Sequence, residues 1–213
     1  MSRPDPILEK LRRLSTPPVS EALGKRGYLL GIKPIFKPIK MVGTAYTVLC
    51  PRRDNLTLHM AIYRAKPGQV LVVNTCMDME SGYWGEIMSM AARKRGLAGL
   101  VIEGCVRDSE AIARMGFPVY SCGISVRGTV KERVGAVECP IPCGGEIVRP
   151  GDYVLGDEDG VVVVPREDAP KVVETALKKM EGEKTVREKI AEGESTLRIY
   201  GFDEKLRRMG IEL

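Results

Sequence analysis

Two short segments contain residue types that could bind a small anion and support metal or acid–base chemistry. They are Gly82–Met88, with the sequence GYWGEIM, and Gly104–Asp108, with the sequence GCVRD. Glycines let the backbone approach a ligand closely, and the free amides of a helix that begins at Glu86 could hold a carboxylate. Arg107 offers a planar fork for a carboxylate or enolate oxygen. Glu86 and Asp108 offer the hard oxygens that Mg²⁺ prefers.

A purely structural interpretation of the second segment remains open. Arg107 and Asp108 could form an ion pair at the start of a helix, with Asp108 as its N-cap. The spacing of these residues does not decide between a cap and a ligand site.

The other candidate residues favour structural roles. His59 is the only histidine, and it lies in an amphipathic segment that predicts a core or surface helix. Unless His59 serves, a Ser-His-Asp or Cys-His mechanism is excluded. The six cysteines form no C-x-x-C pair, and Cys139 and Cys143 lack a nearby histidine, so buried thiols are expected rather than zinc. The residues 157–160, DEDG, favour a polar β-turn over a cation-binding loop, because the EF-hand pattern is missing.

The two segments follow strands in an alternating pattern. Apolar runs at 69–74, 98–104 and 118–123 predict buried strands, and segments 85–96 and 107–116 between them predict helices. This βαβαβ order implies a parallel sheet, in which both segments would lie at the carboxyl ends of adjacent strands. We also expect a strand at 42–50, a hairpin within 146–165 that turns at Asp159-Gly160, and helices at 6–14, 15–27, 56–65, 168–180, 183–191 and 203–209.

Length and composition predict one α/β domain over residues 1–213, with C-terminal helices in 165–213. The sequence has no apolar run long enough for a membrane helix. The N-terminus has no apolar secretory region, so a cytoplasmic location is expected. Only three amides, Asn55, Gln69 and Asn74, stand against 33 basic and 28 acidic side chains. This skew favours a heat-adapted source, because amides are thermolabile and ion-pair networks strengthen with temperature.

The net charge of +5 arises near the N-terminus. Residues 1–53 hold eleven basic and three acidic side chains. We interpret this region as a solvated basic face rather than a nucleic-acid surface, because no aromatic residues alternate with the charges. No G-x-G-x-x-G follows a strand, which disfavours a dinucleotide or S-adenosylmethionine domain of Rossmann type.

Over residues 15–213 the sequence resembles the 4-hydroxy-4-methyl-2-oxoglutarate aldolase family, which also contains the regulator of ribonuclease E activity A. The resemblance rests on an acidic residue, twenty intervening positions and Arg-Asp, here Glu86 and Arg107-Asp108. The segments GEIMSMAARKRGLAGLVIEGCVRD, FPVY and PGDYVLGDEDGVVVVP match as well, and so do Gly193-Glu194, Ile199-Tyr200-Gly201 and Gly210 in the tail.

The resemblance implies a three-layer β/β/α sandwich like the phosphohistidine swivelling domain of pyruvate phosphate dikinase. It also implies homotrimers or hexamers made of two stacked trimers, with sites between neighbours. Family members with the intact motif are class II pyruvate aldolases that need Mg²⁺ or Mn²⁺ and also decarboxylate oxaloacetate. The implied substrate is a small 2-oxo acid, and neither a membrane nor a nucleic acid is an expected partner.

Carried over to this sequence, the resemblance assigns a role to each motif residue. Asp108 would bind the metal directly and Glu86 through water. Arg107 would contact the keto oxygen, and the amides of Gly85, Glu86, Ile87 and Met88 would line the pyruvyl carboxylate.

Two features of the resemblance concern neighbours and relatives. A glutamate from the neighbouring subunit could complete the site, with Glu183 as the first choice and Glu188 as its rival. Glu86 stands where aldolases of the family often have Asp, and Gly82-Tyr83-Trp84 is bulkier than the family pattern.

The alternative function is non-catalytic: a regulator of ribonuclease E-type RNA processing that binds protein or RNA.

Overall fold

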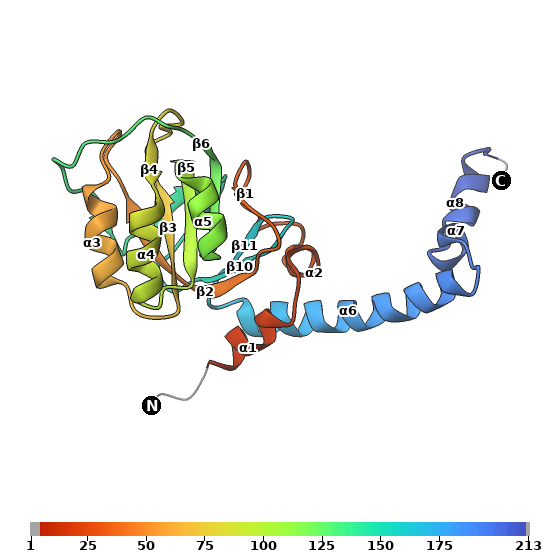
Figure 1. The fold of residues 1–213 in the computed structure, drawn as a ribbon. Coiled ribbons are helices and arrows are strands. Elements are labelled where there is room, and N and C mark those ends of the chain that lie inside the picture. The colour runs from red at the N-terminus through yellow and green to blue at the C-terminus, as the bar shows by residue number, and fades with distance from the viewer. Residues whose placement is uncertain (1–4, 212–213) are drawn as a thin grey trace.

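The computed structural model describes residues 5–211, and in this range the chain alternates between strands and helices (Figure 1). The helices are α1 (Pro6–Arg12), α2 (Thr16–Ala22), α3 (Leu56–Arg64), α4 (Glu86–Lys94), α5 (Ser109–Met115), α6 (Ala169–Ala191), α7 (Thr196–Ile199) and α8 (Phe202–Arg208). The strands are β1 (Lys33–Pro34), β2 (Met41–Leu49), β3 (Gln69–Asn74), β4 (Gly82–Trp84), β5 (Gly99–Val106), β6 (Val119–Ile124), β7 (Ala136–Val137), β8 (Ile141–Cys143), β9 (Glu146–Val148), β10 (Tyr153–Gly156) and β11 (Val161–Val164).

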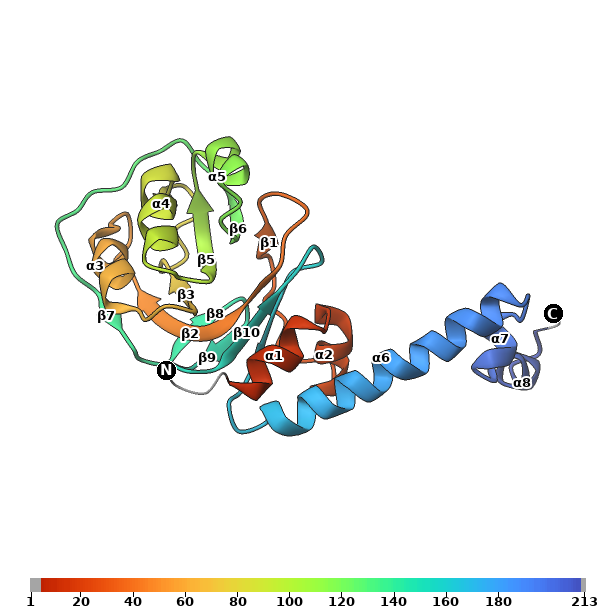
Figure 2. The same ribbon diagram turned by 60° about the horizontal axis from the view of Figure 1, so that its bottom comes forward.

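Most strands join one mixed sheet with the order β1-β6-β5-β3-β2-β10-β11. The pairs β2–β3, β3–β5 and β5–β6 are parallel, which confirms the predicted βαβαβ unit. The β10–β11 pair is an antiparallel hairpin, as the Asp159-Gly160 turn predicts. The sheet curls strongly, so the fold is a mixed α/β structure with a nearly closed, barrel-like sheet (Figure 2).

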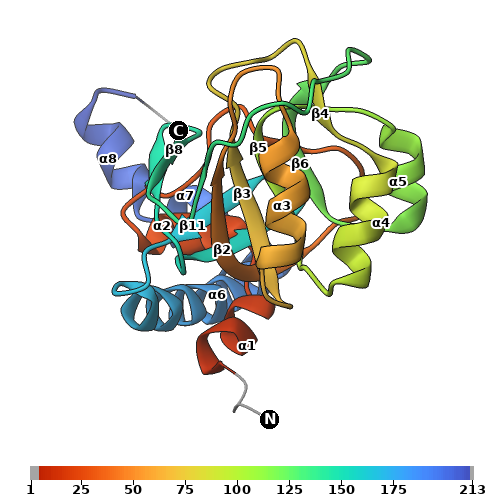
Figure 3. The same cartoon turned by 90° about the vertical axis from the view of Figure 1, so that its left-hand side faces the viewer.

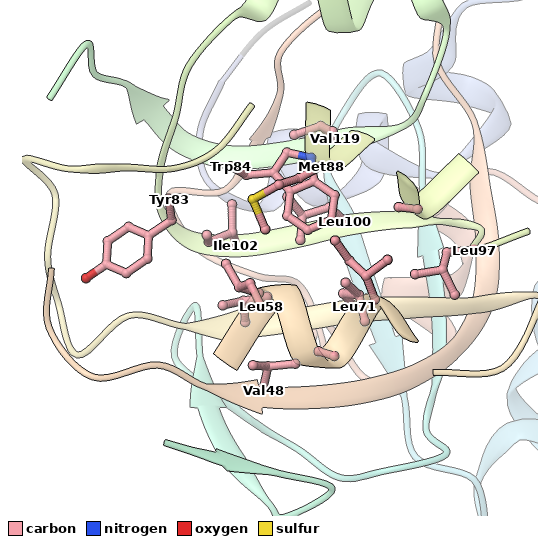
Figure 4. Packing of buried hydrophobic residues seen from close by; sticks show 14 of the residues in the cluster. Val48, Leu58, Leu71, Tyr83, Trp84, Met88, Leu97, Leu100, Ile102 and Val119 are labelled. Carbon is pink, nitrogen blue, oxygen red and sulfur yellow. The ribbon is translucent and has the colours of Figure 1, made fainter. Parts of the chain in front are cut away.

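Helices α3, α4 and α5 lie side by side on one face of the parallel strands (Figure 3). The apolar side chains between them and the sheet form the largest core cluster, which includes Leu58, Leu71, Trp84, Met88 and Leu100 (Figure 4). Burial of these side chains fixes the helices against the sheet. Each fully buried apolar side chain contributes about 1.5–3 kcal/mol relative to leaving it exposed. The loops that precede α4 and α5 therefore start from rigid elements.

The rest of the core lies on the other side of the curled sheet. The small sheet β8–β9 packs there with Val72, Val101 and Tyr120 of the main sheet. A third cluster joins α1, α2 and the first half of α6 to β10 and β11, with Leu11, Leu155 and Val173 fully buried.

The C-terminal part of the chain leaves this body. The second half of α6, with α7 and α8, extends away from the sheet as an arm (Figure 1). The segments 168–180 and 183–191, both predicted to be helical, lie in one helix, because α6 runs unbroken from Ala169 to Ala191. Gly182 lies inside this helix with an ordinary helical backbone. One glycine in a helix interior costs only about 1 kcal/mol, so the helix can continue through it.

Candidate functional site

The two segments singled out in the sequence meet in space. Gly82–Trp84 forms the short strand β4, which pairs in parallel with β5. The Arg107 N–H donates to the Trp84 carbonyl at 2.8 Å. Beyond this pair, the Glu86 N–H donates to Asp108 Oδ2 at 3.1 Å. The two loops are thus joined by both main-chain and side-chain hydrogen bonds.

Asp108 adopts a backbone conformation that few residues other than glycine favour. Its φ of 55° and ψ of 35° lie in the left-handed region, where Asp is among the better tolerated side chains. It occupies the N-cap position of α5, but its carboxylate makes no capping hydrogen bond there. The structural interpretation is therefore correct about the N-cap position of Asp108, but the Asp108 side chain does not cap the helix. The ion pair is present, with Arg107 Nε 3.6 Å from Asp108 Oδ2.

Gly85 is required by the position of that carboxylate. A Cβ atom on Gly85 would collide with Asp108 Oδ2 and would also press on the Arg107 side chain. Its φ of −151° is ordinary extended backbone, so close approach rather than backbone conformation demands glycine. The first turn of α4 can therefore lie directly against Asp108.

The bulky residues before Gly85 hold this turn in place from inside. Trp84 Nε1 donates to Ser89 Oγ at 2.7 Å, and Ser89 Oγ donates to the Gly85 carbonyl at 3.0 Å. The Tyr83 hydroxyl donates to Asp78 at 3.0 Å. Tyr83 and Trp84 are fully buried, so their side chains belong to the core.

A pocket of about 240 Å³ opens beside the junction. Its walls come from the start of α3, the β4–α4 turn, the Arg107-Asp108 pair and the loop that follows β6. Its lining residues are Asn55, His59, Gly82, Tyr83, Trp84, Gly85, Ile87, Met88, Arg107, Asp108, Gly128, Thr129 and Lys131.

Glu86 lies outside this pocket. It lines two open depressions beside α5, one of which it shares with Arg107 and Asp108. The Arg107-Asp108 pair thus separates the pocket from the groove that contains Glu86. The Glu86 N–H donates to Asp108. Of the four amides expected to line a substrate carboxylate, this one therefore already has an acceptor within the protein.

Five pocket residues had no predicted role in the site: Asn55, His59, Gly128, Thr129 and Lys131. Asn55 Nδ2 donates to the Tyr83 carbonyl at 2.8 Å, which fixes the amide orientation, and buried Asn55 Oδ1 has no partner among the described residues. Burial, helped by the charge of Lys131, lowers the pKa of His59 and favours the neutral ring. The period of α3 put His59 on a half-buried face, but no local pattern brings Lys131 to it.

Within one chain, the candidate site contains few side chains that could bind a metal. No cluster of three or more His, Cys, Asp or Glu side chains suited to a metal occurs in residues 5–211. Glu183, the expected contribution of a neighbour, lies in α6 and pairs with Arg187 at 3.5 Å in the same helix. The arm that contains it extends away from α3, β4 and α4, whose residues line the pocket (Figure 1).

The curled mixed sheet and the pocket at the joined β4–α4 and β5–α5 loops define an α/β protein with a pocket at the carboxyl ends of parallel strands. Ligands of α/β proteins commonly bind at this end of the strands. The sequence model of the family described as Aldolase/RraA matches residues 16–163, which is more than half of the chain. The chain belongs to this RraA-like family.

Individual relatives agree with this assignment. A Halalkalibacterium halodurans protein called "Putative 4-hydroxy-4-methyl-2-oxoglutarate aldolase" is 32% identical over 91% of this chain and 93% of its own length. An uncharacterized protein of Methanocaldococcus jannaschii is 36% identical over 86% of this chain and 88% of its own.

A solved structure is similar as well. It is that of a Streptomyces coelicolor protein described as an unusual member of the RNase ES inhibitor RraA protein family. It superimposes with a TM-score of 0.79 at 29% identity and covers 88% of this chain and 98% of its own. In residues 5–211 no helix is both long and apolar enough to span a membrane.

Proposed function

We propose that this protein is a divalent-metal-dependent class II pyruvate aldolase. It would cleave 4-hydroxy-4-methyl-2-oxoglutarate or a similar 2-oxo acid to release pyruvate, and it would also decarboxylate oxaloacetate. The names of its relatives support an aldolase. The observation on which the proposal depends is the junction of Gly85, Arg107 and Asp108, where a carboxylate and a guanidinium share one wall of a pocket.

The donor set fits a hard divalent cation. Asp108 would hold Mg²⁺ or Mn²⁺ directly and Glu86 through water, because Mg²⁺ commonly binds one or two carboxylates and keeps several waters. Gly85 leaves open the space at Asp108 Oδ2 that a Cβ would fill. When bound, the metal supplies Lewis-acid polarisation of the 2-oxo carbonyl.

The chain's own residues would then stabilise the charge that develops on the substrate. Cleavage of the C3–C4 bond, or loss of CO₂ from oxaloacetate, leaves negative charge on an enolate of pyruvate. Arg107 donates hydrogen bonds where that charge develops. The first-turn amides of Ile87 and Met88, at the positive end of α4, orient the carboxylate. The proposed route needs no Schiff base. The two loops contain no lysine, and the lysine that lines the pocket, Lys131, comes from the loop after β6.

Lys131 gives the proposal a more specific substrate class. The loop after β6 contributes Lys131 to the pocket wall, and His59 lines the same pocket with a pKa lowered by burial and by the Lys131 charge. A cation there would pair with the second carboxylate of oxaloacetate or of 4-hydroxy-4-methyl-2-oxoglutarate. Dicarboxylates should therefore be better substrates than 2-oxo acids with one carboxylate.

We also propose that the active assembly is a homotrimer or a hexamer of two stacked trimers. The arm exposes apolar side chains at Ile190, Tyr200, Phe202 and Met209, which a neighbouring copy would cover. Glu183 would reach a site only on a neighbour, because the arm extends away from α3, β4 and α4, whose residues line the chain's own pocket. We also propose that the fold is a three-layer β/β/α sandwich like the phosphohistidine swivelling domain.

Pyruvate release tests the function. Purified protein should produce pyruvate from oxaloacetate and from 4-hydroxy-4-methyl-2-oxoglutarate with Mn²⁺ or Mg²⁺. EDTA should abolish the reaction, and excess metal should restore it. Since free Mn²⁺ itself decarboxylates oxaloacetate slowly, a protein-free sample with the same metal is the control. Turnover that persists in EDTA would refute the metal-dependent mechanism.

The similarity to an RNase ES inhibitor supports one alternative, a regulator that binds a nuclease or RNA. Arg52 and Arg53 are exposed, and Arg53 pairs with Glu80 at 3.3 Å. Binding through this basic face would weaken with salt and on replacing both arginines by Gln. A titration at low salt that shows no binding of RNA or of an RNase E-type nuclease excludes this alternative.

A further inference from the structure

One wall of the pocket is an irregular segment that the fold holds at both ends. We call residues Ser125–Gly135, between β6 and β7, the strap. It passes over the top of β4 toward α3 (Figures 1 and 3). The strap has little regular structure and is mostly exposed, yet Gly128, Thr129 and Lys131 line the pocket.

The first end of the strap is tied to the loop before β4. The Gly82 N–H donates to the Arg127 carbonyl at 2.7 Å, and the Arg127 guanidinium pairs with Glu80 at 2.9 Å. The Ser125 N–H donates to the Val106 carbonyl at 2.9 Å. These contacts fix the strap where it leaves the sheet.

The second end is tied to the start of α3 through one buried carboxylate. The Asp54 side chain is fully buried. Its Oδ1 accepts the Leu56 N–H at 3.0 Å, and its Oδ2 accepts the N–H groups of Glu132 and Arg133 at 2.9 and 2.7 Å. Asp54 thus joins the first turn of a core helix to the strap.

Main-chain bonds on either side complete this attachment. The Val130 N–H donates to the Arg53 carbonyl at 2.9 Å, and the Asn55 N–H donates to the Val130 carbonyl at 3.2 Å. The Gly135 N–H donates to Thr57 Oγ1 at 2.8 Å. Lys131 lies between the residues that these bonds hold, so its backbone position depends on them.

We propose that Asp54 is a positioning residue that keeps Lys131 at the pocket by holding the backbone of the strap at Glu132 and Arg133. Asp54 itself does not line the pocket. Its effect on substrate binding passes through Lys131, and in that respect the inference rests on the proposed function. The effect of Asp54 on the geometry of the pocket does not depend on the proposed function.

His59 provides a readout that does not need activity. It is the only histidine in the chain, so its ring signal in an NMR titration needs no assignment. The charged groups that line the pocket with it are Lys131 from the strap and Arg107 and Asp108 from the loop after β5. Burial lowers the pKa of His59 most, and the Lys131 charge lowers it further, so this pKa should rise if Lys131 moves away from the ring.

The experiment compares the pKa of His59 in the full chain, treated with EDTA, across variants. Lys131→Met should raise this pKa because it removes the positive charge. Asp54→Asn should raise it as well, because an amide keeps the size of the side chain but loses a charged acceptor for two N–H groups. The double variant should match Lys131→Met, since Asp54 acts through Lys131.

Two further variants separate positioning from general loss of structure. Asp152→Asn alters another buried aspartate that accepts backbone N–H groups, from Arg149 and Arg166, away from the strap. It should leave the pKa of His59 unchanged. If Asp54→Asn does not fold, Thr57→Val removes the neighbouring attachment at Gly135 and should also raise the pKa.

The outcomes are distinct. A pKa of His59 that rises in Lys131→Met but not in folded Asp54→Asn overturns the proposal, and so does an equal rise in Asp152→Asn. With active enzyme, Asp54→Asn and Lys131→Met should each lower kcat/KM for oxaloacetate about tenfold, mainly through KM. Absence of any activity would refute the proposed function while leaving the pKa test of Asp54 intact.

Discussion

Asp108 shows how local conformation and site chemistry coincide in a single residue. A left-handed backbone turns its carboxylate away from α5, whose cap it could have been, and toward the first amide of α4. One carboxylate oxygen thereby joins two loops that are twenty residues apart. Gly85 makes this contact possible, because any side chain there would occupy the position of Asp108 Oδ2.

Gly85→Ala should therefore damage the site more than the fold. The added Cβ displaces the half-exposed Asp108 carboxylate, which can move into solvent. Pyruvate release should fall at least about tenfold, which corresponds to about 1.4 kcal/mol of transition-state stabilisation. Gly182→Ala, at an open position inside α6, is the matched control. It should keep full activity and raise stability by up to about 1 kcal/mol. Equal activity in the two variants would contradict this account of Gly85.

Arg107→Ala should remove the stabilisation of the enolate. Loss of a preorganised donor to a developing oxyanion costs about 100-fold or more in kcat. The control is Arg95→Ala, which removes an exposed guanidinium that donates to the Tyr63 carbonyl on another part of the surface. Steady-state pyruvate release measures both variants. A kcat within a few-fold of wild type for Arg107→Ala would mean that the enolate charge is stabilised elsewhere.

The sequence predicted the meeting of the two loops, because adjacent parallel strands end at one edge of a sheet. It did not predict Lys131, which reaches the pocket through an irregular strap whose path depends on hydrogen bonds to Asp54. It did not predict the orientation of Asn55 either, since only the Tyr83 carbonyl determines which amide atom is left without a partner. Residues placed by long-range hydrogen bonds leave no periodic signal.

Among the elements, β4 differs most from expectation, and α6 is more continuous than two separate helical segments would be. Gly82–Trp84 is a strand because its main chain pairs with β5, although three residues with a glycine have little strand signal of their own. The single helix α6 continues through Gly182, since residues on both sides are good helix formers. Strand pairing and helix packing thus determine the secondary structure of segments whose local propensity is weak.

Two buried aspartates tie loops to helices and strands, and they predict how stability depends on pH. Burial alone would raise the pKa of Asp54, but N–H donors from Leu56, Glu132 and Arg133 hold it below 3.8. Burial would also raise the pKa of Asp78, but hydrogen bonds from the Glu80 N–H and the Tyr83 hydroxyl hold it below 3.8 as well. The folded state thus binds fewer protons than the unfolded state just below pH 3.8.

The stabilisation from these carboxylates should be complete well above pH 3.8 and should be lost as the pH falls through their folded pKa values. Urea unfolding at a series of pH values from 7 to 3 measures this dependence. Asp54→Asn should be less stable than wild type at pH 7 and should show a shallower loss below pH 4. An unchanged slope in that variant would show that Asp54 does not titrate below its ordinary range.

At the scale of the whole molecule, the body and the arm have different roles. The buried side chains of α6 end at Ala176, with Leu177 and Met180 partly buried, so residues 183–211 add little to the core. A chain truncated after Gly182 should fold with near-native stability but lose self-association and activity, measured by light scattering and pyruvate release. A fully active truncated monomer would contradict the proposed assembly.

Point variants in the arm test its chemical contribution. Glu183→Gln should lower activity without changing the assembly if Glu183 completes a neighbour's site, whereas Glu188→Gln should leave it unchanged. The reverse pattern would assign the role to Glu188. The heat-adapted source inferred from the scarcity of amides stays a prediction, which a thermal unfolding curve would check.

Exchange of the pyruvate methyl protons with D₂O tests the central claim most directly, because it needs only enolate formation and no knowledge of the natural aldol. With Mn²⁺ or Mg²⁺, wild-type protein should exchange these protons faster than metal alone, as followed by NMR. EDTA and Arg107→Ala should each abolish the acceleration, while Arg95→Ala should keep it. Exchange that equals the metal-only rate, or that survives in Arg107→Ala, would contradict the account.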